Sequence, residues 1–323
     1  MQPDLVRVDP TGPSLRRRMP RRRRTWLLVL LAVILAAGAL GTGAIAVNAF
    51  GAGTLFERLE AKIDRWLAGP PPDRATLPTV EVTDPPDTPS PSPVPATSEQ
   101  PTGSGRPDGT PKPTPTPIPR VPVDIDIVAK HGPEFSSEIK DVWCSPAGVT
   151  TALAIMGLGP ASDARQQEIA SRIHEWEAYQ DSKNGDWGPA AMALALDAYG
   201  APGYKVYAFS SMPTALRYAA KAIASTNSPA LLLAWKGAHT WVMTGFKADA
   251  DPRVFDDAKI RGAYIDDVWY PRISSIWGAS NKPGTFDNMS VMAANFLPWK
   301  RPEGHYPGRD GKFIVVLPTI RRG

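Results

Sequence analysis

The stretch Asp141-Val-Trp-Cys-Ser-Pro-Ala-Gly-Val-Thr-Thr-Ala-Leu-Ala-Ile-Met156 decides how the folded part of this chain begins. It is apolar after Cys144, the only cysteine among 323 residues. Pro146 stands where the first turn of a helix would lie, and the missing N–H costs nothing there. The pattern therefore predicts a helix over 145–156. Because a helix N-terminus favours a thiolate over a thiol, Cys144 is either a candidate nucleophile or a small buried hydrophobic residue.

The segments that follow this helix indicate an α+β fold. Helical spacing of apolar residues predicts helices over 163–179, 189–199 and 213–224. Alternating or continuous apolar runs predict strands over 204–209, 229–235, 239–246, 263–270 and 312–317, with a short turn at 236–238. Helices come first and strands cluster late, which favours an α+β order over an alternating βαβ order.

The N-terminal segments predict a membrane anchor. Residues 1–24 carry eight arginines and two aspartates, so this basic tail has a net charge of +6 and the remainder of the chain about −2. The basic character therefore belongs to the tail, and no nucleic-acid partner is expected. Residues 25–50 are uncharged and long enough for a transmembrane helix. The arginines predict a single-pass cell-membrane protein with a cytoplasmic N-terminus and an extracytoplasmic C-terminal domain.

Two segments separate this anchor from the globular domain predicted at 123–323. Residues 51–68 have apolar side chains at helical spacing, which predicts a juxtamembrane amphipathic helix that lies on lipid or pairs with a second copy. Residues 69–122 contain 18 of the 36 prolines, which predicts a disordered linker that could reach the cell wall. A cleaved signal peptide and a twin-arginine export signal are the alternatives to an uncleaved anchor.

A thiol nucleophile needs a base and a third group that orients the base. Among the four histidines, His131 lies at the edge of the linker, His174 on a charged helix and His305 in a Pro/Gly-rich loop. His239 begins an apolar strand and shares one strand face with Trp241. We therefore expect His239 to be the base, the alternative being a hydrogen-bonded core histidine.

Two adjacent carboxylates are candidates for the orienting group. Asp266 and Asp267 interrupt an otherwise apolar predicted strand, where a carboxylate needs a specific reason. Alternation along the strand lets only one of them face the same side as His239. The alternative is that both cap a turn or a helix. The candidates for a substrate groove are Trp143, Trp241 and Trp269. Trp269, Trp277 and Trp299 either line such a groove or fill the core.

Four ordered segments resemble the papain-like cysteine peptidases. They are Trp143–Ala147, Asp186–Gly200, Ala238–Phe246 and Tyr264–Asp267. More narrowly, they resemble cysteine peptidase family 39, whose transporter-fused members trim double-glycine leaders from bacteriocins and which has stand-alone extracellular relatives. The resemblance implies a papain-like fold with helices packed on an antiparallel sheet. It also implies a Cys-His-Asp triad of Cys144, His239 and Asp267, with Asp266 as the other choice for the third member.

One departure from that family concerns the oxyanion. The family often has a glutamine six residues before the cysteine, whereas this chain has Glu138. An ionised glutamate accepts hydrogen bonds and repels a forming oxyanion, so it could not replace the glutamine unless it is protonated or displaced. Either the backbone N–H groups of Cys144 and a neighbour form the oxyanion hole, or the activity is weak.

The sequence as a whole predicts a membrane-anchored, extracytoplasmic cysteine peptidase that hydrolyses peptide or amide bonds in a peptide or protein substrate. A weak or inactive papain-like binding module and a cell-wall amidase or transpeptidase are the alternatives. The chain has no zinc-type spacing and no Gly-rich phosphate loop, and the acidic loop at 248–257 lacks the pattern of a calcium loop. No metal and no cofactor are expected.

Overall fold

The computed structural model describes residues 52–81, 118–182, 187–300, 305–306 and 308–321. Contacts divide the chain into two units, Met1–Leu59 and Glu60–Gly323, and the second contains the sheet and the helices that pack on it. The predicted tail at 1–24 and transmembrane helix at 25–50 lie outside the described residues, as does most of the predicted linker. Among the residues that are described, no helix has both the length and the apolar character needed to cross a membrane.

The observed elements confirm an α+β class. The helices are α2 (Ala52–Ala68), α3 (His131–Glu134), α4 (Cys144–Ile155), α5 (Asp163–Ser171), the 3-10 helix η2 (Ile173–Glu175), α6 (Pro189–Ala198), α7 (Met212–Thr226), α8 (Ala234–Gly237) and α9 (Met289–Asn295). The strands are β1 (Thr79–Glu81), β2 (Val123–Asp126), β3 (Tyr204–Phe209), β4 (Ala230–Leu233), β5 (His239–Ala248), β6 (Ile260–Asp267), β7 (Ile273–Ser274), β8 (Gly278–Ala279), β9 (Thr285–Asn288) and β10 (Phe313–Pro318).

The main sheet has the strand order β1-β3-β10-β4-β5-β6-β9, with β2 added beside β5. β1 pairs with β3 in parallel, and the other pairs are antiparallel. The long strand β5 pairs with β4 along its first half and with β2 along its second half. On its other side it pairs with β6, in a register that sets Trp241 opposite Asp267. The start of β5 and the end of β6 are therefore neighbours.

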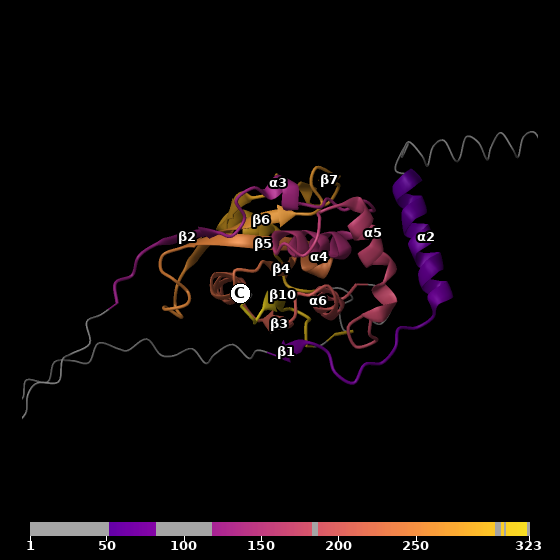
Figure 1. Cartoon of the computed structure of the whole chain (residues 1–323), viewed down its shortest axis with the longest axis horizontal. Helices are drawn as coiled ribbons and strands as arrows, with labels where there is room; N and C mark the ends of the chain where they lie inside the picture. Colours follow the sequence, from indigo (N-terminus) through magenta and orange to yellow (C-terminus); the bar gives the residue numbers. More distant parts are fainter. Residues whose placement is uncertain (1–51, 82–117, 183–186, 301–304, 307, 322–323) are drawn as a thin grey trace, which may run out of the picture. The chain divides into compact units, whose positions relative to one another are not determined.

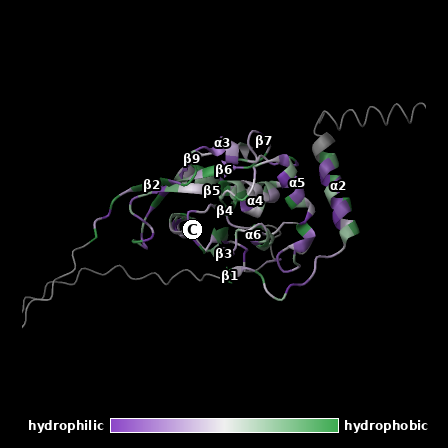
Figure 2. Ribbon diagram, in the orientation of Figure 1, coloured by the Kyte–Doolittle hydropathy of each residue, from purple (hydrophilic) through white to green (hydrophobic). Residues whose placement is uncertain are grey.

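Helices cover the sheet on two faces because side chains alternate along each strand. In β10, Ile314 and Val316 belong to a core cluster with α4, α5 and α6, whereas Val315 and Leu317 belong to a cluster with α7 and α9. Figure 1 shows α4, α5 and α6 grouped beside the strands. Figure 2 shows that α6 is mostly apolar and α5 mostly polar, which fits the deep burial of α6 and the three buried residues of α5.

The packing of α4 on β5 positions the cysteine. Ten of the twelve residues of α4 are buried, and the helix begins at Cys144. A Cβ added to Gly148 would lie 2.6 Å from Cγ2 of Thr240, so only glycine allows α4 to approach β5 this closely without a shift. The first turn of α4 consequently lies beside the first residues of β5.

The structure differs from the sequence predictions in several places, and the strand predicted over 229–235 is the shorter β4, because the chain enters α8 at Ala234. The helix predicted over 163–179 ends at Ser171, because the chain turns there and brings Trp176 into the core. The strand predicted over 263–270 is β6 at Ile260–Asp267, because β5 continues to Ala248 and pairs with Ile260. Part of the predicted disordered linker is also ordered, since β1 lies within it and pairs with β3. The helix predicted over 51–68 is present as α2.

Candidate functional site

Cys144 is the first residue of α4 and its side chain is partly buried. Its Sγ lies 4.0 Å from the carbonyl oxygen of Ala238, the residue before β5. The first N–H groups of a helix have no acceptor within the helix, and the helix dipole is positive at this end. This position therefore favours a negative charge on the sulfur.

His239 is held by a left-handed turn and by aromatic contacts. Trp235, Lys236 and Gly237 have φ values of 52°, 61° and 85°, a conformation that is costly for non-glycine residues. The turn stacks the indole of Trp235 on the imidazole, with ring centroids 4.0 Å apart and planes 18° apart. Trp269 meets the same imidazole edge-on at 6.4 Å. His239 is 2% exposed, so its ring has little freedom to turn.

One nitrogen of His239 is occupied by a carboxylate. Nε2 lies 2.7 Å from Oδ1 of Asp267, at the end of β6. The same Oδ1 accepts a hydrogen bond of 3.0 Å from the backbone N–H of Trp269, which fixes the carboxylate. Nδ1 of His239 is left for another partner.

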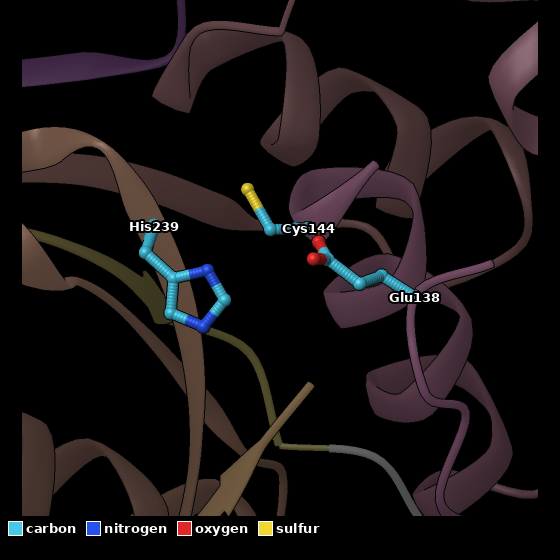
Figure 3. A group of neighbouring side chains, drawn as sticks. All are labelled: Glu138, Cys144 and His239. Atoms are coloured by element: carbon cyan, nitrogen blue, oxygen red, sulfur yellow. The ribbon is translucent and has the colours of Figure 1, made fainter. Parts of the chain in front are cut away.

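Figure 3 shows Glu138, Cys144 and His239 as neighbours that come from three separate segments. One sulfur, one nitrogen and one carboxylate oxygen of these residues all lie within 4.8 Å of one another. The thiol therefore has both an imidazole and a carboxyl group close to it.

The electrostatics of this group favour an ion pair between sulfur and imidazole. Burial opposes ionisation of the Cys144 thiol, but the contact with His239 and hydrogen bonding by Thr240 together lower its pKa. Burial also opposes the charge on His239, yet Asp267 and Cys144 raise its pKa to about 10. The pKa of Asp267 is lowered because His239 outweighs the effect of burial. A thiolate beside an imidazolium is the nucleophilic form of such a pair.

Glu138 lies in the segment between α3 and α4 and is 2% exposed. Its backbone N–H donates to the carbonyl oxygen of Val268 at 2.9 Å. The next residue, Ile139, donates its N–H to Oε1 of Gln166 at 2.9 Å, and Nε2 of Gln166 donates to Ser136 and Ser137. Gln166 is fully buried on α5 and was missed in the sequence, where it stands as one polar residue of a polar helix.

Asp266, the other carboxylate considered for the site, faces away from His239. Its Oδ1 lies 2.8 Å from Nδ1 of His131 and accepts the backbone N–H of Gly284 at 2.7 Å. Nε2 of His131 lies 3.0 Å from Asp126. His131 is thus bound to the sheet through two carboxylates and is not a loose residue at the edge of a linker.

The three tryptophans proposed for a groove lie in different surroundings. Trp241 is 3% exposed and belongs to a core cluster, and it also lines a small pocket together with Trp235 and Asp267. Trp143 and Trp269 are partly exposed. A neighbour missed in the sequence is Arg272, whose Nη1 bonds to Asp141 at 2.6 Å and lies 3.8 Å from Oε1 of Glu138.

Thiol, imidazole and carboxylate also form a donor set of the kind that zinc accepts. We assign no metal ligand here, because His239 already interacts with both Asp267 and Cys144. The expectation that the chain uses no metal stays a prediction.

Comparison of the chain with family models, with curated proteins and with solved structures found no match.

Proposed function

We propose that this chain is a cysteine peptidase with a papain-like fold, and that Cys144, His239 and Asp267 are its catalytic residues. The observation that carries the proposal is the proximity of the three groups: a sulfur at a helix N-terminus, an imidazole nitrogen within 4.8 Å of it, and a carboxylate oxygen 2.7 Å from Nε2 of that imidazole. Nucleophile, base and orienting group are the parts that acyl transfer requires.

In the proposed reaction the Cys144 thiolate attacks the carbonyl carbon of a peptide or amide bond, and a C–S bond forms. His239 gives its proton to the leaving nitrogen as the C–N bond breaks, which leaves a thioester. Water then attacks the thioester, gives a proton to His239, and the C–S bond breaks to release the acid. Asp267 holds the imidazole in one orientation throughout and stabilises its positive charge whenever His239 is protonated.

The proposed location is extracytoplasmic, with the uncharged segment 25–50 as a membrane anchor and the arginines of 1–24 in the cytoplasm. The proline-rich segment would let the domain work at a distance from the bilayer. A peptide or protein is the proposed substrate. A cell-wall amidase or transpeptidase would use the same three residues, so cell-wall fragments belong in any substrate screen.

The test combines thiol labelling with a substrate screen. Because the pKa of Cys144 is lowered, we expect iodoacetamide to label the full-length chain already near pH 6, and a Cys144→Ala variant not to be labelled. The full-length chain should cleave members of a broad peptide library, and the variant should not. Labelling that begins only near the ordinary thiol pKa of about 8.5, together with no cleavage, would indicate the inactive binding module instead.

A further inference from the structure

Glu138 is a buried residue with a carboxyl oxygen within 4.8 Å of the Cys144 sulfur. Within the described part of the chain, its Oε1 is buried and has no hydrogen-bond partner. Arg272 is 3.8 Å from that oxygen and makes its shorter bond to Asp141. A buried polar atom without a partner is costly, so its retention next to a reactive sulfur needs a reason.

Hydrogen bonds fix the backbone of the segment that carries Glu138. The N–H groups of Glu138 and Ile139 are bound to Val268 and to the buried Gln166, on opposite sides of the segment. The backbone of Glu138 is thus held between the end of β6 and α5, and its carboxyl group lies near Cys144 (Figure 3). A carbonyl oxygen bonded to the carbon under attack would lie between the sulfur and this carboxyl group.

We propose that Glu138 is a neutral carboxylic acid that donates a hydrogen bond to the oxyanion formed when Cys144 attacks a carbonyl carbon. This inference rests on the proposed peptidase function. As the C–S bond forms, the electron pair of the C=O double bond moves onto oxygen. That oxygen accepts the O–H of Glu138 and a backbone N–H of the first turn of α4. Glu138 keeps its proton, and the proton for the leaving group comes from His239.

The groups that face Glu138 support its neutral form. Burial raises its pKa to about 9, and the negative charges of Cys144 and Asp141 act in the same direction. His239 and Arg272 oppose this shift without cancelling it. Below that pKa the side chain has an O–H donor where a glutamine would have an N–H donor. Above it, the carboxylate would repel the oxyanion, so acylation should fail at high pH although the thiolate persists.

Two variants of Glu138 distinguish the effect of its hydrogen-bond donor from the effect of its side-chain shape. Glu138→Gln keeps a donor at every pH, and Glu138→Met keeps a similar length without a donor. Acylation of the full-length chain by p-nitrophenyl acetate forms an oxyanion, whereas alkylation by iodoacetamide displaces iodide and forms none. Cys144→Ala gives the background rate for both reagents.

At pH 7 we expect Glu138→Gln to acylate within about threefold of the wild type and Glu138→Met to acylate at least about 100-fold more slowly, the usual effect of losing one oxyanion donor. Both should alkylate within about threefold of the wild type. Between pH 8 and pH 10 the acylation rate of the wild type relative to Glu138→Gln should fall about tenfold.

Two results would overturn the inference. One is that Glu138→Met acylates as fast as the wild type while alkylating normally. The other, which decides the matter if Glu138→Met is misfolded, is that the wild type and Glu138→Gln have the same profile up to pH 10. Failure of the proposed function itself looks different, because the wild type would then acylate no faster than Cys144→Ala.

Discussion

Two histidine-aspartate pairs lie on opposite faces of one sheet, and they differ in what the second imidazole nitrogen meets. In the first pair, Asp267 binds His239 and the remaining nitrogen faces the region of Cys144. In the second, Asp266 binds His131 and the remaining nitrogen meets another carboxylate, Asp126. The distances from imidazole to aspartate are nearly the same, at 2.7 and 2.8 Å. A histidine-aspartate pair is therefore not a sign of catalysis by itself; the third group determines its chemistry.

The two histidines also differ in which charged groups raise their pKa values. Both histidines have a pKa raised to about 10, although burial opposes the charge in each. The groups that raise the pKa of His239 are Asp267 and the Cys144 sulfur. The groups that raise the pKa of His131 are Asp126 and Asp266. An imidazolium beside a thiolate can deliver a proton to a leaving group, whereas an imidazolium between two carboxylates joins the segment before α4 to the sheet.

The largest expected difference is between the peptide-cleavage rates of His239→Ala and His131→Ala. We expect His239→Ala to lower the rate of peptide cleavage about 1000-fold or more, because the base and the stabilising charge for the thiolate are both lost. His131→Ala should keep the rate within about threefold when measured well below its melting temperature. Equal losses in the two variants would contradict the assignment of His239 as the base.

The two neighbouring aspartates offer the next comparison. Asp267→Ala should lower the cleavage rate about 100-fold, because His239 loses the group that orients it. Asp266→Ala, one residue earlier on the opposite face, should change the rate by less than about threefold. The rate at saturating substrate should be measured for both variants. Circular dichroism spectra of both variants then show whether each one folds like the wild type. A loss of rate in Asp266→Ala with an unchanged spectrum would contradict the assignment of Asp267 alone as the residue that orients His239.

Substitution in the second pair, His131 and Asp266, should lower the stability of the fold. Asp266 is fully buried, so His131→Ala leaves an unpaired charge inside the protein and should lower the free energy of unfolding by about 3 kcal/mol. Urea denaturation of the wild type and the variant measures this difference. A difference below about 0.5 kcal/mol would show that the pair does not hold the segment in place.

The pH dependence of that difference is the finest test. The pKa of His131 is about 10 in the folded chain, above its ordinary value of 6.5. Protonated His131 therefore stabilises the fold fully below pH 6.5, and this contribution is lost as the pH rises through 10. The difference in unfolding free energy between wild type and His131→Ala should be largest near pH 6 and should shrink toward pH 10. A difference that grows with pH would contradict the ion pair.

The sequence was sufficient to predict several of the elements and to name candidate residues for the site. Apolar spacing and Pro146 predicted the helix that begins at Cys144, and the run from His239 onward predicted β5. The alternation of a strand predicted that only one of Asp266 and Asp267 could face His239. These features are visible in a sequence because helix and strand periods are local properties of the chain.

Only the tertiary structure decided which partners these residues meet. That Asp267 and not Asp266 binds His239 depends on the register of β6 against β5, and that His131 reaches Asp266 depends on a contact across 135 residues of chain. The raised pKa of Glu138 likewise follows from its burial in a segment that Gln166 and Val268 hold between α5 and β6. Register, burial and the charges around a group are set by distant segments packed together, so the sequence could name Glu138 as a difficulty without determining its charge.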